Sequence, residues 1–76
     1  MNFDKPNTVS KTTLNLAAGD RVLSGNCILG FWSYEIVSVD AKAAHNKRMA
    51  VLTVRFDHGG EVKMLEGKNA RWDVVA

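Results

Sequence analysis

The sequence predicts an all-β domain. Short runs of β-branched and aromatic residues follow one another along the chain, and glycine-containing turns separate them. Several of these runs alternate apolar and polar residues with a period of two, which is typical of half-buried strands. With 76 residues, the chain is long enough for one small domain whose apolar strips must nearly all be used to build a single core.

The first eleven residues are expected to form a flexible arm. They contain the only proline, Pro6, among polar residues, and they show neither a helical nor a strand period. A segment of this kind buries too little apolar surface to offset the entropy lost on ordering it. The sequence therefore predicts an arm over residues 1–11 and the folded domain over residues 12–76.

The first half of the domain is predicted to contain a short strand, a turn and a hairpin. Residues 12–16 alternate apolar and polar side chains, and residues 17–20 then turn the chain into a strand that starts at Arg21. Residues 27–40 form the longest apolar run, which we interpret as one long strand. Gly30 interrupts this run, and a bulge or kink is expected there.

The second half shows the clearest pattern. Residues 49–57 place even-numbered apolar residues on one face, and the turn at residues 57–60 has the glycine chemistry of a hairpin. The even-numbered face is predicted to be inward on the next strands as well, giving one cluster of Leu52, Val54, Phe56, Val62, Met64, Trp72 and Val74. Residues 41–48 lack an amphipathic stripe, and their interpretation as helix or loop stays open.

This order of elements resembles a small SH3-like barrel. The turn Gly19-Asp20-Arg21-Val22, the long bent strand and the aspartate–glycine hairpin are similar to those of Tudor and KOW-type modules. The resemblance covers most of residues 14–76 and implies a small five-stranded SH3-like barrel that binds a partner rather than catalysing a reaction. An OB-fold, with residues 41–48 as its helix, is the competing architecture.

The residues that carry most enzyme chemistry are sparse. Cys27 is the only cysteine, and neither it nor His45 or His58 has the spacing of metal ligands. The acidic residues are scattered singly, so no pair of carboxylates is predicted for acid–base catalysis. We therefore expect a non-enzymatic protein without metal or cofactor. An enzyme whose active site is assembled at an oligomer interface is kept as an alternative, after the two binding functions given below.

Two aromatic residues share one face of the long strand. Trp32 and Tyr34 are two positions apart, so both point into the core or both point outward. An outward pair would offer a surface for stacking on nucleic-acid bases. The sequence leaves this choice open, because a bulge would reset the alternation.

One segment concentrates positive charge without balancing acids between the cations. It contains Lys42, His45, Lys47 and Arg48. Together with Trp32 and Tyr34 these residues form the predicted nucleic-acid-binding site, for DNA or RNA. The alternative is a protein-interaction or self-assembly module that uses the aromatic and apolar face of residues 31–39 and the last strand.

The compartment is predicted from cysteine usage and hydropathy. A single cysteine excludes an internal disulfide, and no apolar run approaches the roughly 20 residues that span a bilayer. We therefore expect a cytoplasmic protein without a membrane partner.

Overall fold

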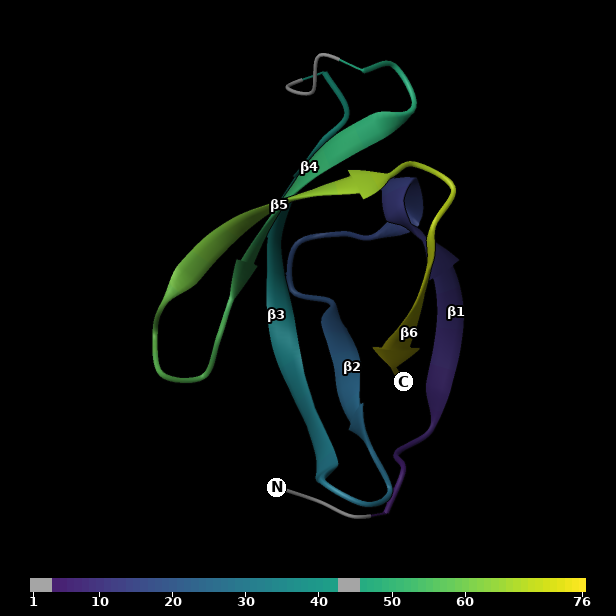
Figure 1. The fold of residues 1–76 in the computed structure, drawn as a ribbon, viewed down its shortest axis with the longest axis vertical. Coiled ribbons are helices and arrows are strands. Elements are labelled where there is room, and N and C mark those ends of the chain that lie inside the picture. The colour runs from purple at the N-terminus through teal and green to yellow at the C-terminus, as the bar shows by residue number, and fades with distance from the viewer. Residues whose placement is uncertain (1–3, 43–45) are drawn as a thin grey trace.

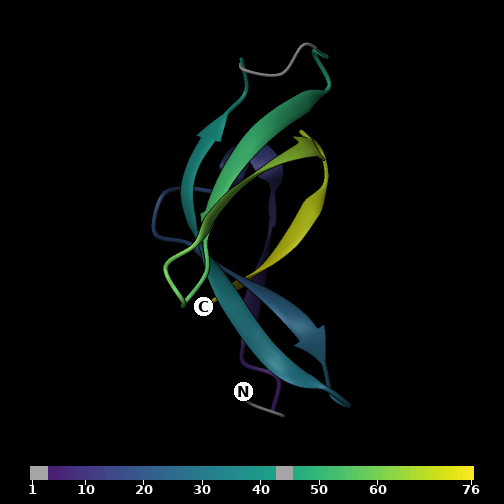
Figure 2. The same ribbon diagram turned by 60° about the vertical axis from the view of Figure 1, so that its left-hand side comes forward.

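The computed structural model describes residues 4–42 and 46–76, which form one antiparallel sheet. The strand order is β1-β6-β2-β3-β4-β5, and both views show that the sheet is strongly twisted (Figures 1 and 2). The predicted all-β class is confirmed. The elements are β1 (Thr8–Thr12), the short 3₁₀ helix η1 (Thr13–Asn15), β2 (Arg21–Asn26), β3 (Gly30–Asp40), β4 (Met49–Arg55), β5 (Glu61–Gly67) and β6 (Arg71–Val75).

The sheet has six strands where the sequence predicted five. Strands β2 to β5 follow one another as a meander, and β6 returns to pair with β2, where Val22 faces Val74. β1 then extends the sheet beyond β6. In the part of the chain that the structure describes, β1 and β5 are the two edges and do not pair with each other, so the sheet is open.

Strand β1 lies within the segment predicted as a flexible arm. Its backbone pairs with β6 from Thr8, opposite Val75, to Thr12, opposite Arg71. The arm interpretation is therefore wrong for residues 8–11, and the sheet begins at Thr8. The segment lacks an apolar period because β1 is an edge strand with mainly half-exposed or exposed side chains, and its order comes from backbone pairing with β6.

The predicted strand over residues 12–16 is mostly a 3₁₀ turn. The Thr13 amide donates to the carbonyl of Ala70, and the Leu16 amide donates back to the carbonyl of Thr13. The apolar residues at positions 14 and 16 suggested the alternation of a strand, but the chain turns between them. Leu14 is therefore 49% exposed, whereas Leu16 is buried.

The turn over residues 17–20 is confirmed. The Asp20 carboxylate accepts hydrogen bonds from the Ala17 amide at 2.9 Å and from Lys11 Nζ at 3.1 Å. The Ala17 bond, and then the bond to Lys11, hold the pKa of Asp20 below its ordinary value. Gly19 adopts a positive φ of 95°, the conformation that glycine accepts without a steric penalty. This turn sets the start of β2.

The long predicted strand begins later and bends elsewhere than expected. Residues 27–29 form the turn between β2 and β3, and β3 starts at Gly30. The register irregularity lies between Ile36 and Ser38, so the bulge predicted at Gly30 is wrong. After this irregularity the alternation is reset, because Val39 rather than Ser38 packs against the core.

The core lies on the concave side of the twisted sheet. Its buried apolar residues are Leu16, Val22, Ile36, Ala50, Leu52, Val54 and Val74. Of the seven residues predicted to cluster, three are buried here, and Phe56, Met64 and Trp72 pack against them. Val62 is the exception, since it is 45% exposed on the edge strand β5. The inward face was therefore predicted correctly, but its extent was overestimated.

One polar side chain is completely buried among the described residues. Thr13 Oγ1 donates to the carbonyl oxygen of Gly67 at 2.6 Å and accepts from Trp72 Nε1 at 2.8 Å. The hydroxyl therefore ties η1 to the end of β5 and to the indole of β6. Such a shared hydrogen-bond partner fixes the position of η1 over the sheet.

Candidate nucleic-acid interface

A depression of about 530 Å³ lies where η1, the start of β4 and the β5–β6 turn meet. We call it the basic depression. Its lining consists of Leu14, Lys47, Arg48, Met49, Gly67, Lys68, Asn69 and Ala70. Three of these eight residues are cationic and none is acidic, so the site attracts anions.

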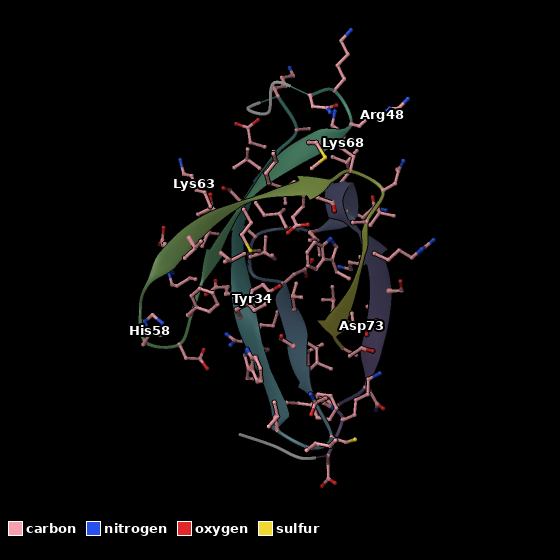
Figure 3. All side chains as sticks on the ribbon, viewed as in Figure 1. Tyr34, Arg48, His58, Lys63, Lys68 and Asp73 are labelled. Atoms are coloured by element: carbon pink, nitrogen blue, oxygen red, sulfur yellow. The ribbon has the colours of Figure 1, made fainter. Side chains whose placement is uncertain are left out.

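Backbone pairing between distant segments builds the basic depression. Met49 faces Gly67 in the β4–β5 register, and the Lys68 amide donates to the carbonyl oxygen of Arg48 at 2.9 Å. Lys68 and Arg48 consequently lie close together at the same end of the molecule (Figure 3). Two cations that are twenty positions apart in sequence thus line the same depression.

The cations of the basic depression form no ion pair within the part of the chain that the structure describes. Across residues 4–42 and 46–76, the ion pairs are Lys11–Asp20, Arg21–Asp57, Arg55–Glu35 and Arg55–Glu61. None of these pairs involves Lys47, Arg48 or Lys68. Since no ion pair within these ranges neutralises the three cations, their charge is available to an incoming anion.

The predicted basic segment is only partly placed. Lys47 and Arg48 line the basic depression, and the Arg48 amide donates to the side chain of Asn46 at 2.8 Å. Lys42 is exposed just after β3, where its amide donates to Asp40 Oδ1 at 2.9 Å, and it does not line the depression. His45 lies outside the described residues.

The two predicted aromatic residues differ in burial, which answers the question left open by the sequence. Tyr34 packs against the core, and its ring lies 5.7 Å from that of Phe56. Burial, together with the charge of Glu66, raises the pKa of Tyr34, so its hydroxyl stays protonated at neutral pH. Trp32 points to the same side of β3 but is 44% exposed, because the core does not extend that far along the strand.

The aromatic residues and the cations are not brought together. Trp32 is near the start of β3, opposite Ser24 of β2, whereas the segment with Lys47 and Arg48 follows the other end of β3. Eight strand positions separate Trp32 from Asp40, a length of about 26 Å at roughly 3.3 Å per residue. The predicted surface that combines stacking rings and cations is therefore not formed by Trp32 and the basic segment.

Lys68 and Leu14 were missed in the sequence. Lys68 was not singled out, and Leu14 was assigned to the strand predicted over residues 12–16. Their place in the depression depends on the β4–β5 register and on η1, both of which are long-range features of the fold. For Lys68, the only local signal was the preceding glycine, Gly67. A glycine at this place indicates a turn, and side chains in turns usually face the solvent.

A second exposed surface lies at the opposite end of the molecule. Ile28 is 81% exposed, Leu29 is 63% exposed and Trp32 follows them on β3. We call these three residues the apolar hairpin tip. Residues 22–34 contain no charged side chain. The apolar run of residues 27–40, which was interpreted as one long strand, therefore includes an exposed turn.

The comparisons with known proteins give no relative: no family model, no curated protein and no solved structure matches this chain. Within the described ranges, no cluster of three or more His, Cys, Asp or Glu side chains is arranged to hold a metal ion. No helix in the described part of the chain is long and apolar enough to cross a membrane.

Proposed function

We propose that this chain is a small non-enzymatic binding module that contacts the phosphates of DNA or RNA through the basic depression. The observation that carries the proposal is the convergence of Lys47, Arg48 and Lys68 around one depression without an acid. Nucleic-acid backbones present closely spaced negative charges, and cations bind them by releasing condensed counterions. The net charge of the chain is only +2, so its overall charge attracts nucleic acid weakly. The proposal therefore depends on the three cations gathered at the depression.

The proposal includes a finer description of the fold. Strands β2 to β6 are taken as the five-stranded unit of the SH3-like barrel that the sequence resembles, and β1 is an addition at its edge. The support is that β6, the last strand, returns to pair with β2, the first of these five. In such a unit the basic depression lies at one end, where loops and turns meet.

Replacing Lys47 and Arg48 together by alanine is expected to weaken nucleic-acid binding similarly for all sequences. Each phosphate contact contributes about 0.9 to the slope of log K against log salt on duplex DNA and about 0.7 on a single strand. The double variant should therefore reduce this slope by roughly one to two units. Fluorescence anisotropy titrations of labelled oligonucleotides at several salt concentrations measure it.

The matched control removes the same charge elsewhere. Lys5 and Lys63 are exposed and do not line the depression, and Figure 3 shows Lys63 to the left of Arg48 and Lys68. The variant with both replaced by alanine should keep a steeper slope than the Lys47/Arg48 variant. Equal slopes would assign the effect to net charge, and a wild-type protein without salt-sensitive binding would overturn the proposal.

The apolar hairpin tip favours a second candidate function, self-assembly. Asn26 Oδ1 accepts hydrogen bonds from the amides of Ile28 and Leu29 at 2.9 and 2.8 Å. The turn can therefore enter an apolar contact without leaving these amides unsatisfied. Trp32 packs closely over Gly25, where an added Cβ would lie 2.8 Å from the indole. Exposed apolar residues on an ordered turn are typical of protein-interaction sites.

Self-assembly predicts that the sedimentation coefficient of the wild-type protein rises with concentration. Replacing Ile28 and Leu29 together by serine should remove this rise, because the contact would lose most of its apolar area. Leu65→Ser is the control, since Leu65 is similarly exposed, at 58%, on β5. A wild-type protein that remains monomeric at every concentration would contradict this candidate.

A further inference from the structure

We infer that the basic depression takes a base of a single-stranded nucleic acid, while its cations hold the adjoining phosphates. This inference rests on the proposed function and adds the class of ligand. It starts from a feature that phosphate binding leaves unexplained, namely the apolar part of the lining, which we call the apolar floor. Leu14 and Met49 line the same depression as Lys47, Arg48 and Lys68.

The apolar floor includes a large, solvent-exposed side chain. Leu14 is 49% exposed, although it lies on a short element packed against the sheet. A site that bound phosphate alone would gain nothing from leucine at this position, because phosphate oxygens need hydrogen-bond donors and positive charge. An apolar, flat group beside the phosphate would cover Leu14 and Met49 and remove their surface from water.

The floor is rigidly positioned before any ligand binds. The Thr13 amide is bonded to Ala70 at 3.0 Å, and the Thr13 hydroxyl is buried between Gly67 and Trp72. Leu14 is the next residue, so its backbone has little freedom to move away from the depression. Preorganisation of this kind lowers the entropy that binding must overcome.

The geometry favours a single strand over a duplex. In a duplex the bases are paired and stacked inside, and a protein meets phosphates and groove edges. A single strand can turn one base out of its stack and lay it on a protein surface. Asn69 is the one uncharged side chain in the lining that can hydrogen-bond a base edge, so only a weak sequence preference is expected.

The test compares two labelled single strands that have the same number of phosphates. One carries normal bases, and the other carries abasic spacers throughout its centre. The wild-type protein should bind the intact strand about five- to tenfold more tightly, with equal salt slopes for the two strands, since removing the bases leaves the charges unchanged. A duplex of the same length serves as a third probe, and its affinity should not depend on Leu14, because its bases are paired and stacked inside.

A protein variant identifies the floor as the cause. Leu14→Ser should lower the affinity for the intact strand to that for the abasic strand and leave abasic binding unchanged. Val9→Ser is the control, because Val9 is 48% exposed on β1 and does not line the depression. Circular dichroism checks that both variants keep the strand content of the wild type.

The outcomes separate this inference from the proposed function. Salt-sensitive binding with equal affinity for intact and abasic strands would overturn the base-binding inference and leave phosphate contact standing. An unchanged affinity of Leu14→Ser for the intact strand would also overturn it. Absence of salt-sensitive binding to every probe would remove the proposed function, and the inference with it.

Discussion

Leu52→Ala is expected to lower the free energy of unfolding by about 2–5 kcal/mol. Leu52 is completely buried in the middle of β4, between β3 and β5, where it faces Val39 and Met64. Its truncation removes apolar contacts and leaves a cavity that regular strand pairing on both sides keeps from collapsing. The whole free energy of unfolding of a protein is only about 5–15 kcal/mol, so this loss is a large fraction of it. The urea concentration at the midpoint of unfolding should therefore fall strongly.

The control is Val62→Ala on the neighbouring strand. Val62 belongs to the same face by alternation and pairs with Val54, but it is 45% exposed. Its truncation should cost no more than about 0.5 kcal/mol. Equal losses at Leu52 and Val62 would mean that the core extends across β5 and that the burial described above is wrong.

Thr13→Val is expected to cost about 1–3 kcal/mol although valine has nearly the same shape as threonine. The substitution removes the hydroxyl that donates to Gly67 and accepts from Trp72. The Gly67 carbonyl keeps its bond from the Ala70 amide, whereas the Trp72 indole N–H loses its acceptor, the Thr13 hydroxyl. The main cost is therefore an unsatisfied donor in a part-buried position.

Thr13→Ser separates this cost from that of packing. Serine keeps the hydroxyl and loses one methyl group, so it should retain more stability than valine does. Thermal unfolding followed by Trp fluorescence measures both variants. If Thr13→Val were as stable as the wild type and Thr13→Ser less stable, the methyl group rather than the hydrogen bonds would hold η1 in place.

The parts of the fold that could be predicted are those in which local pattern and tertiary contacts agree. In β4, the even-numbered apolar residues Ala50, Leu52 and Val54 matched a strand that is buried on one face. The hairpin after β4 was also predictable, because Gly59 adopts a positive φ of 92° and its amide closes the turn on Phe56.

The rest depends on partners that lie far along the chain. β1 is ordered by pairing with β6, and residues 8–12 have no apolar period that would predict a strand. An apolar run such as residues 27–39 does not reveal which of its residues lie in a turn. Ile28 and Leu29 are exposed in the turn, although both are residue types that are common in buried strands. The bulge near Val37 leaves no local mark either.

The candidate site divides in the same way. Local charge was enough to select Lys47 and Arg48, because consecutive cations stand out in any sequence. Lys68 and Leu14 join them through register and through the turn at η1. Trp32 was selected for its chemistry alone, and position along β3 then separated it from the cations.

The pairing of β1 with β6 bears on the order in which the sheet assembles. The hairpins from β2 to β5 connect neighbours in sequence, whereas joining Thr8 to Val75 closes a loop of nearly the whole chain. The entropy of loop closure grows with the length of the loop, so the hairpins have the smaller barrier. The hairpins of the meander are therefore expected to form before β1 joins the sheet.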